Sequence, residues 1–239
     1  ITYVIIALLI IILNIKALPA AVVLVVKSAF MPKAVFGAAA GITIKLAMQK
    51  GIGRGIFSNE AGLGSAPIAA AAAQTKEPVR QGLVTMTGTF IDTIVICTMT
   101  GLSIVITNAQ AQYVPDVFEG VKITSYAWQN GLPFPSQVSA FLLMMCLAFF
   151  AFTTILGWDY YSERCLEYLT NGNMTAVKVF KWLYIAAVFV GPYLTVSIVW
   201  GVADIFNGLM AFPNLIALFA LSGVVASETK KFFDKHKEL

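Results

Sequence analysis

The stretch Gly51-Ile-Gly-Arg-Gly-Ile-Phe-Ser-Asn-Glu-Ala-Gly-Leu-Gly-Ser-Ala-Pro67 decides the fold, because it cannot form one uninterrupted helix. Five glycines lie within fourteen residues, and Pro67 follows them. In a helix interior a glycine costs about 1 kcal/mol relative to alanine, and a proline costs about 3 kcal/mol. The composition therefore predicts a helix that breaks at or near residues 58–65.

The chain around this stretch has the composition of an integral membrane protein. Its 239 residues are 59% hydrophobic and only 12% charged, and its mean hydropathy is +0.82. A soluble domain carries about 25% charged residues. The length suits roughly six or seven membrane spans with short loops.

Polar residues divide the sequence into segments, and we expect an all-α protein. The expected elements are membrane spans or parts of spans at residues 1–13, 34–73, 82–107, 138–158, 182–200 and 201–226, an interfacial helix broken by Pro19 and Pro32 at 16–33, polar segments at 74–80, 108–136 and 159–181, and a charged tail. The chain begins inside an apolar run, so we expect it to be a fragment that starts in a cut membrane helix.

The distribution of lysine and arginine predicts the orientation. These residues are frequent in segments 74–80 and 159–181 and in the tail, whereas segment 108–136 carries only Lys122. The positive-inside rule therefore places the first three on the cytoplasmic side. The net charge of +4 is explained by this topology and does not indicate nucleic-acid binding. The predicted orientation fits least well at three basic residues, Lys45, Lys50 and Arg54, because it places them at or inside the membrane.

A broken helix at membrane depth predicts a binding site. Non-helical backbone survives there only where it lines a cavity or is buried in protein. Secondary transporters build their central sites from such breaks, where the amino ends of half-helices face anionic groups and freed carbonyls coordinate cations. Glu60 inside the break is costly in lipid and should have a partner or a water-lined position. The alternative is close helix packing through small residues, which also fits this glycine spacing and is our interpretation of Gly37 and Gly41.

Three further polar positions are candidates. Asp92 is an acid within a span, and such a residue is by default a candidate for a functional role. The alternative is a hydrogen bond that helps to pack the helix against a neighbouring helix or the broken segment. Thr153 and Thr154 are adjacent hydroxyls on an apolar helix; they could ligate a hard cation or bond to their own helix carbonyls. We interpret Asp204 as a helix-end residue near the membrane interface.

Other classes of function lack the residues they need. A serine nucleophile needs a base within reach, but the only histidine, His236, lies in the charged tail. Ile56 stands where a dinucleotide-binding motif requires its last glycine. Three scattered cysteines give neither a disulfide framework nor a metal signature. An intramembrane enzyme is therefore the weakest of the hypotheses, and we expect no cofactor.

The residues 54–67 resemble the signature of the alanine-or-glycine:cation symporters, the sodium/alanine symporter family. Further collinear matches cover essentially the whole chain. They are Pro78-Val-Arg-Gln-Gly82, Phe90-Ile-Asp-Thr93 with Cys97-Thr98, Phe152-Thr-Thr-Ile-Leu-Gly-Trp-Asp-Tyr-Tyr161, Val199-Trp-Gly-Val-Ala-Asp204 and Gly208-Leu-Met-Ala-Phe-Pro-Asn214.

This resemblance implies the second inverted repeat of a leucine-transporter-type fold. Residues 1–225 would hold the end of the fifth core helix and the second five-helix repeat, and residues 226–239 would form a cytoplasmic tail. Residues 34–73 would be the broken sixth helix. Thr153 and Thr154 would form part of a Na⁺ site. The implied substrate contacts are Phe57, Ser58, Asn59, Gly62, Gly64 and Ser65.

The resemblance also implies the function: sodium-coupled import of alanine or glycine across the inner cell membrane by alternating access. An amino-terminal half that completes both sites would be missing from this chain. Proton coupling through Glu60 or Asp92 remains an alternative. So does a membrane fragment that does not transport.

Overall fold

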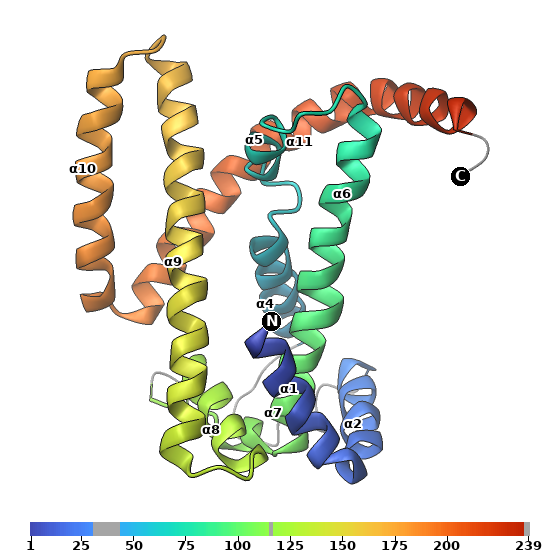
Figure 1. The fold of residues 1–239 in the computed structure, drawn as a ribbon, viewed down its shortest axis with the longest axis vertical. Helices are drawn as coiled ribbons and strands as arrows, with labels where there is room; N and C mark the ends of the chain where they lie inside the picture. Colours follow the sequence, from blue (N-terminus) through green and yellow to red (C-terminus); the bar gives the residue numbers. More distant parts are fainter. Residues whose placement is uncertain (31–43, 115–116, 237–239) are drawn as a thin grey trace. The chain divides into compact units, whose positions relative to one another are not determined.

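The computed structural model describes residues 1–30, 44–114 and 117–236. In these ranges every regular element is helical (Figure 1). Gly37, Gly41 and Pro32 lie outside the described residues. The elements are α1 (Thr2–Leu13), η1 (Ile15–Ala17), α2 (Leu18–Phe30), α4 (Ile44–Asn59), α5 (Ala66–Ala70), α6 (Pro78–Phe90), the π-helical η2 (Ile91–Cys97), α7 (Thr98–Ile106), η3 (Ala109–Gln112), α8 (Val121–Gly131), α9 (Ser136–Leu169), α10 (Met174–Val190), η4 (Gly191–Tyr193) and α11 (Val196–Lys235).

Within the described ranges, four helical segments are long and apolar enough to cross a membrane. They are Pro78–Ile106, Ser136–Leu169, Met174–Tyr193 and Val196–Lys235. A fifth would be the pair Thr2–Leu13 and Ile15–Ser28, which is bent by 74°. The all-α, multi-pass membrane architecture predicted from composition is therefore confirmed.

Several predicted boundaries were wrong because charged residues do not end these helices. Segment 159–181 is not a polar connection: α9 continues to Leu169, and α10 begins at Met174. Ion pairs one turn apart, such as Arg164 to Glu167 at 2.6 Å, accommodate charge within a helix. The Asn173 side chain caps α10 by accepting from two of its first backbone amides.

The expected span at 182–200 is also wrong, since the chain turns within it. α10 ends at Val190, η4 contains Pro192, and α11 begins at Val196. Thr195 caps α11 by accepting a hydrogen bond from the backbone amide of Ile198. α11 then continues through residue 226 to Lys235, so the charged tail is helical up to that point.

The segment 108–136 was expected to be a polar loop, but it contains helix α8. Trp128 on this helix is fully buried. The structure divides into two compact units, and α8 belongs to the first, which comprises Ile1–Ile52 and Ile91–Phe152. The second unit comprises Gly53–Phe90 and Thr153–Leu239.

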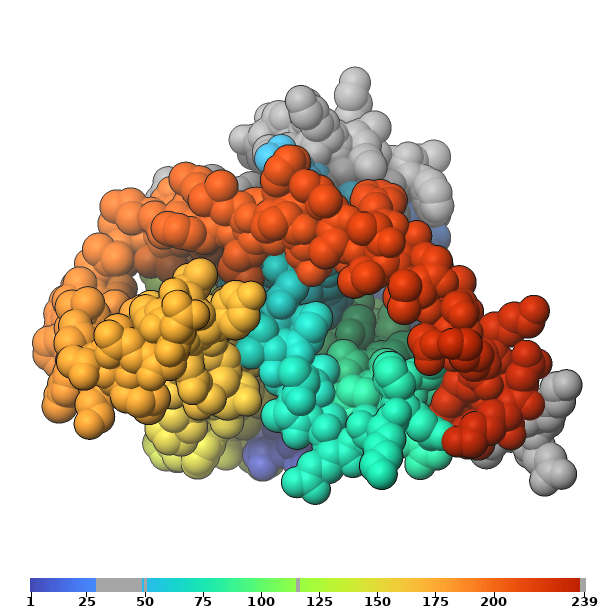
Figure 2. Space-filling model, turned by 90° about the horizontal axis from the view of Figure 1, so that it is seen from above, coloured from blue at the N-terminus to red at the C-terminus, as the bar shows by residue number. Residues whose placement is uncertain are grey.

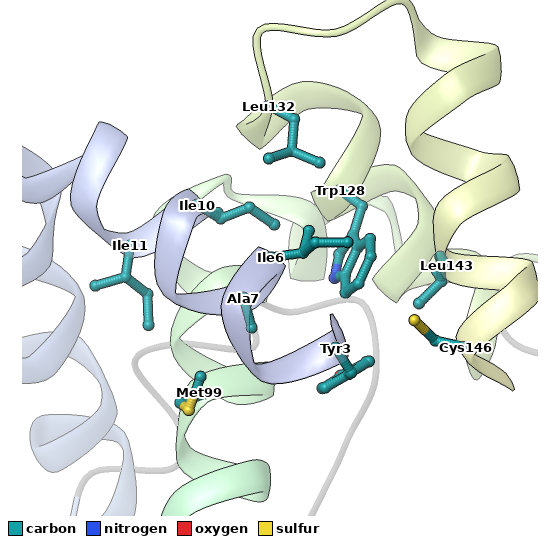
Figure 3. Packing of buried hydrophobic residues seen from close by; sticks show 10 residues of the cluster. All are labelled: Tyr3, Ile6, Ala7, Ile10, Ile11, Met99, Trp128, Leu132, Leu143 and Cys146. Carbon is teal, nitrogen blue, oxygen red and sulfur yellow. The ribbon is translucent and has the colours of Figure 1, made fainter. Parts of the chain in front are cut away.

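The core of the first unit forms where α1, α7, α8 and α9 meet (Figure 3). The rings of Tyr3 and Trp128 lie 5.2 Å apart, and Tyr3 shares a 2.6 Å hydrogen bond with Thr100. Gly131 permits a close approach here: a Cβ at that position would lie 2.7 Å from Cγ2 of Ile10. The apolar cluster comprises Tyr3, Ile6, Ala7, Ile10, Ile11, Met99, Trp128, Leu132, Leu143 and Cys146.

In the second unit, the carboxyl-terminal part of α9 and α10 form an antiparallel hairpin (Figure 1). Tyr184 donates a 2.9 Å hydrogen bond to the carbonyl of Ile155, and Lys181 pairs with Glu163. In Figure 2 the teal segment that follows α4 lies next to the orange-to-red α11. The contacts between this segment and α11 build the site described below.

The far end of α11 is held to the loop before α6 by a charge cluster centred on Glu77. Lys235 Nζ lies 2.8 Å from Glu77 Oε1, and Arg80 lies 3.0 Å from Oε2. His236 Nε2 is 3.8 Å from the same carboxylate. The hydrogen bond from Lys235 lowers the pKa of Glu77 below its ordinary value of 4.5; partial desolvation opposes this, and the nearby positive charges reinforce it.

The lowered pKa of Glu77 predicts that acid releases the end of α11. Because the folded pKa is depressed, the stabilisation is present above pH 4.5 and is lost as the pH falls through the folded pKa. Spin labels on Lys76→Cys and Lys230→Cys, in a cysteine-free protein, should report a broader distance distribution at low pH. Glu77→Gln should give this broad distribution at pH 7 already. A distribution that is unchanged in the variant and at low pH would contradict the prediction.

Candidate functional site

The helix break lies where the sequence predicts it. α4 ends at Asn59 and α5 begins at Ala66. Between them Glu60, Gly62 and Gly64 have positive φ angles of 55°, 78° and 85°. A right-handed helix cannot continue through such angles. The earlier glycines at 51, 53 and 55 remain helical, so the break is confined to the residues after Asn59.

Hydrogen bonds within the break satisfy its most polar groups. The Ser65 hydroxyl donates to Glu60 Oε2 at 2.8 Å, and Ser65 is only 1% exposed. The Asn59 Oδ1 accepts from the backbone amide of Ala61 at 3.1 Å. The prediction that Glu60 needs a partner is therefore confirmed. These bonds fix the shape of the loop from its own residues.

α11 supplies a further hydrogen bond to the break. Asn214 Nδ2 donates to the carbonyl oxygen of Gly62 at 3.0 Å. Asn214 directly follows Pro213, the one proline inside α11. A Cβ on Gly64 would lie 3.1 Å from Cγ and Oδ1 of Asn214, so a glycine is needed for this approach. The break and the centre of α11 are therefore in direct contact.

The end of α4 also contacts α11. Arg54 Nη1 lies 2.9 Å from Asp204 Oδ1, and Nη2 lies 3.4 Å from Oδ2. The guanidinium carbon sits 3.6 Å from the centre of the Trp200 ring. Phe57 packs edge-on against the same ring with centroids 5.3 Å apart. A guanidinium with a two-point carboxylate contact and an aromatic face is well accommodated near a membrane.

These contacts correct the interpretation of Asp204. They also explain how Arg54, which the predicted orientation places at or inside the membrane, is accommodated. Asp204 lies within α11, which begins at Val196, and pairs with Arg54 instead of ending a helix. The sequence contained a signal that was missed. An arginine in an apolar segment requires a partner, and Asp204 is the only acid in residues 201–226.

The remaining candidate residues lie on other elements. Thr153 and Thr154 are exposed on α9, in the second unit. Asp92 lies in the π-helical turn η2, in the first unit. Single π turns are rare and frequently mark functional sites. The described contacts join Phe57, Glu60, Gly62, Gly64 and Ser65 to one another or to α11; the cation site remains a prediction.

A family model described as "Sodium:alanine symporter family" matches residues 1–239. The chain belongs to this family. Similar proteins include a Haemophilus influenzae protein described as an uncharacterized transporter, which is 52% identical over 99% of this chain and 50% of its own length. The sodium/alanine symporter AgcS of Methanococcus maripaludis is 43% identical over 98% of this chain and 50% of its own length. The probable sodium/glutamine symporter GlnT of Bacillus subtilis is 38% identical over 98% and 47%.

Membership of this family confirms the predicted resemblance, and the apolar helices agree with a multi-pass membrane protein. The chain spans about half the length of these relatives. One of these relatives is named as a sodium/alanine symporter and another as a probable sodium/glutamine symporter.

Proposed function

We propose that this chain takes part in sodium-coupled import of alanine or glycine across the inner cell membrane by alternating access. The observation that carries the proposal is the break between α4 and α5, where three residues with positive φ interrupt a helix in an apolar, multi-pass protein. Broken helices of this kind form the central sites of secondary transporters. Membership of the symporter family supports the same function.

The last turn of α4 has the chemistry to bind a cationic group. The final carbonyls of a helix lack intrahelical partners, and the helix dipole makes this end partially negative. In our proposal they face the ammonium group of the amino acid or a sodium ion. The Asn59 amide and the Ser58 hydroxyl lie in the same turn, while Ser65 holds Glu60 in place. The proposed substrate contacts remain Phe57, Ser58, Asn59, Gly62, Gly64 and Ser65.

The fold that we propose is the second repeat of a leucine-transporter-type architecture. Residues 1–225 would contain the end of the fifth core helix and the second repeat, with residues 226–239 as a cytoplasmic tail. Thr153 and Thr154 on α9 would contribute hydroxyl oxygens, which suit a hard cation, to one Na⁺ site.

Labelled-alanine uptake into liposomes tests the function. The complete protein is reconstituted, and an inward sodium gradient is compared with an equal choline gradient. We expect uptake only with sodium, inhibited by excess glycine. Inhibition by glutamine alone would shift the proposed substrate, and equal uptake in both gradients would contradict sodium coupling.

Replacing Thr154 by alanine is expected to weaken sodium dependence. Loss of one oxygen ligand should raise the sodium concentration for half-maximal uptake by about three- to tenfold, the range of one polar interaction. Thr87→Ala is the matched control, since this exposed hydroxyl donates to its own helix carbonyl of Val84 and makes no other hydrogen bond within the part of the chain that the structure describes. A wild-type sodium response in Thr154→Ala would contradict the assigned cation site.

The alternative of proton coupling is favoured specifically by the π turn that contains Asp92. Under this alternative, uptake would follow a pH gradient, persist without sodium and be lost in Asp92→Asn. The same liposomes distinguish the two mechanisms.

A further inference from the structure

The segment around the break is attached to α11 at two points, one on each side of residues 57–59, which are three of the predicted substrate contacts. Before them, Arg54 makes a two-point contact with Asp204. After them, Asn214 donates to the carbonyl of Gly62. All of these residues belong to the same compact unit. Residues 57–59 therefore lie between two positions in the sequence that are each hydrogen-bonded to α11.

The two attachment points are widely separated along α11. Asp204 and Asn214 are ten residues apart, which corresponds to about 15 Å of helix. Contacts at two distant points restrain rotation as well as translation of the attached segment. A single contact would leave the end of α4 free to pivot.

The attachment after residues 57–59 lies next to Pro213, the proline inside α11. Pro213 has no backbone N–H, so it cannot bond to the carbonyl of Leu209 and weakens the helix at this position. Asn214 is the next residue. A change in the bend of α11 would therefore act directly on Gly62.

We infer that Arg54, Asp204 and Asn214 are positioning residues. Through their contacts α11 fixes the geometry of residues 57–59 and thereby sets substrate affinity. This inference rests on the proposed function. Of the two attachments, Asn214 has the stronger effect, because its loss leaves a backbone carbonyl in the break without this donor. The pair of Arg54 and Asp204 is 31% and 51% exposed, and water weakens it, although stacking on Trp200 partly compensates.

The test uses the complete protein with two substitutions on α11 and one control. Asn214→Ala removes the donor, and Asp204→Asn preserves shape but removes the charge. Asn207→Ala is the matched control, since within the described residues Asn207 makes no hydrogen bond to the break. We expect the KM for alanine uptake to rise about three- to tenfold in Asn214→Ala, less in Asp204→Asn, and to stay within about twofold in the control.

A second readout does not depend on transport. Cys97, Cys146 and Cys165 are replaced, and a single Ser58→Cys is labelled with a soluble thiol reagent. Its labelling rate should change at least about threefold in Asn214→Ala and not in Asn207→Ala. If one variant fails to fold, the other decides.

Suppose that the wild type transports alanine or glycine. The inference is then overturned if Asn214→Ala and Asp204→Asn both keep the wild-type KM or the wild-type labelling rate. A charge-swapped double variant, Arg54→Asp with Asp204→Arg, should recover part of the affinity lost in either single variant; simple addition of the two losses would also overturn it. If the wild type transports neither alanine nor glycine, the proposed function fails, and the labelling rates alone decide whether α11 positions the break.

Discussion

Replacing Gly64 by alanine is expected to destabilise the break and abolish most alanine uptake. The left-handed conformation at φ +85° costs a non-glycine residue about 1–2 kcal/mol. The added methyl group would lie 3.1 Å from the Asn214 side chain, and overpacking costs about 1–3 kcal/mol. Asn214 cannot turn away without losing its hydrogen bond to Gly62. Thermal unfolding in detergent and uptake in liposomes measure both effects.

Substitutions at two other glycines separate the cost of the left-handed backbone from the cost of the contact with Asn214. Gly62→Ala should be intermediate, because its φ is +78° but the nearest atom to the new Cβ is 3.8 Å away. Gly55→Ala should be neutral or stabilising by up to about 1 kcal/mol, since Gly55 is helical with open space around it. Equal unfolding temperatures for the three variants would show that neither backbone strain nor the contact with Asn214 shapes the break.

The position of the break could be predicted because it is a local property. Glycine and proline act through their own backbone preferences, so residues 51–67 contain the information without any tertiary contact. The need of Glu60 for a partner followed from the cost of a carboxylate in an apolar segment. In both cases the cause and the effect lie within a few residues.

The attachment to α11 could not be predicted in the same way. Arg54 and Asp204 are 150 residues apart in the chain, and Gly62 and Asn214 are 152 apart. Their pairing depends on tertiary packing. Even so, an isolated arginine and an isolated acid in two apolar segments are a usable signal, because each requires compensation.

The misplaced helix ends have a different origin. The charged residues between 159 and 181 favour a polar segment between helices, but polarity marks contact with water and not the end of a helix. The ends are instead set by backbone signals that were present: Gly172 has a positive φ, and Asn173 caps α10. Likewise, Pro192 and the Thr195 cap mark the turn before α11. Capping residues are therefore better guides to these boundaries than charge.

Replacing Trp128 by alanine is expected to produce the largest loss of stability in the first unit. Trp128 is fully buried, and its ring packs against Tyr3 at 5.2 Å. Removal of a buried tryptophan side chain typically costs about 3–5 kcal/mol, because the cavity collapses only in part. Trp182→Ala is the matched control, since this side chain is 73% exposed on α10 and should lose little.

Trp128→Phe separates packing from hydrogen bonding at the same position. The indole N–H is buried and has no acceptor among the described residues. A buried donor without a partner costs about 1–3 kcal/mol, so phenylalanine removes this cost while it keeps one aromatic ring. We therefore expect Trp128→Phe to unfold close to the wild-type temperature and Trp128→Ala far below it. If Trp128→Phe is as destabilised as Trp128→Ala, the indole N–H must make a hydrogen bond that stabilises this core, and packing alone cannot account for the role of Trp128.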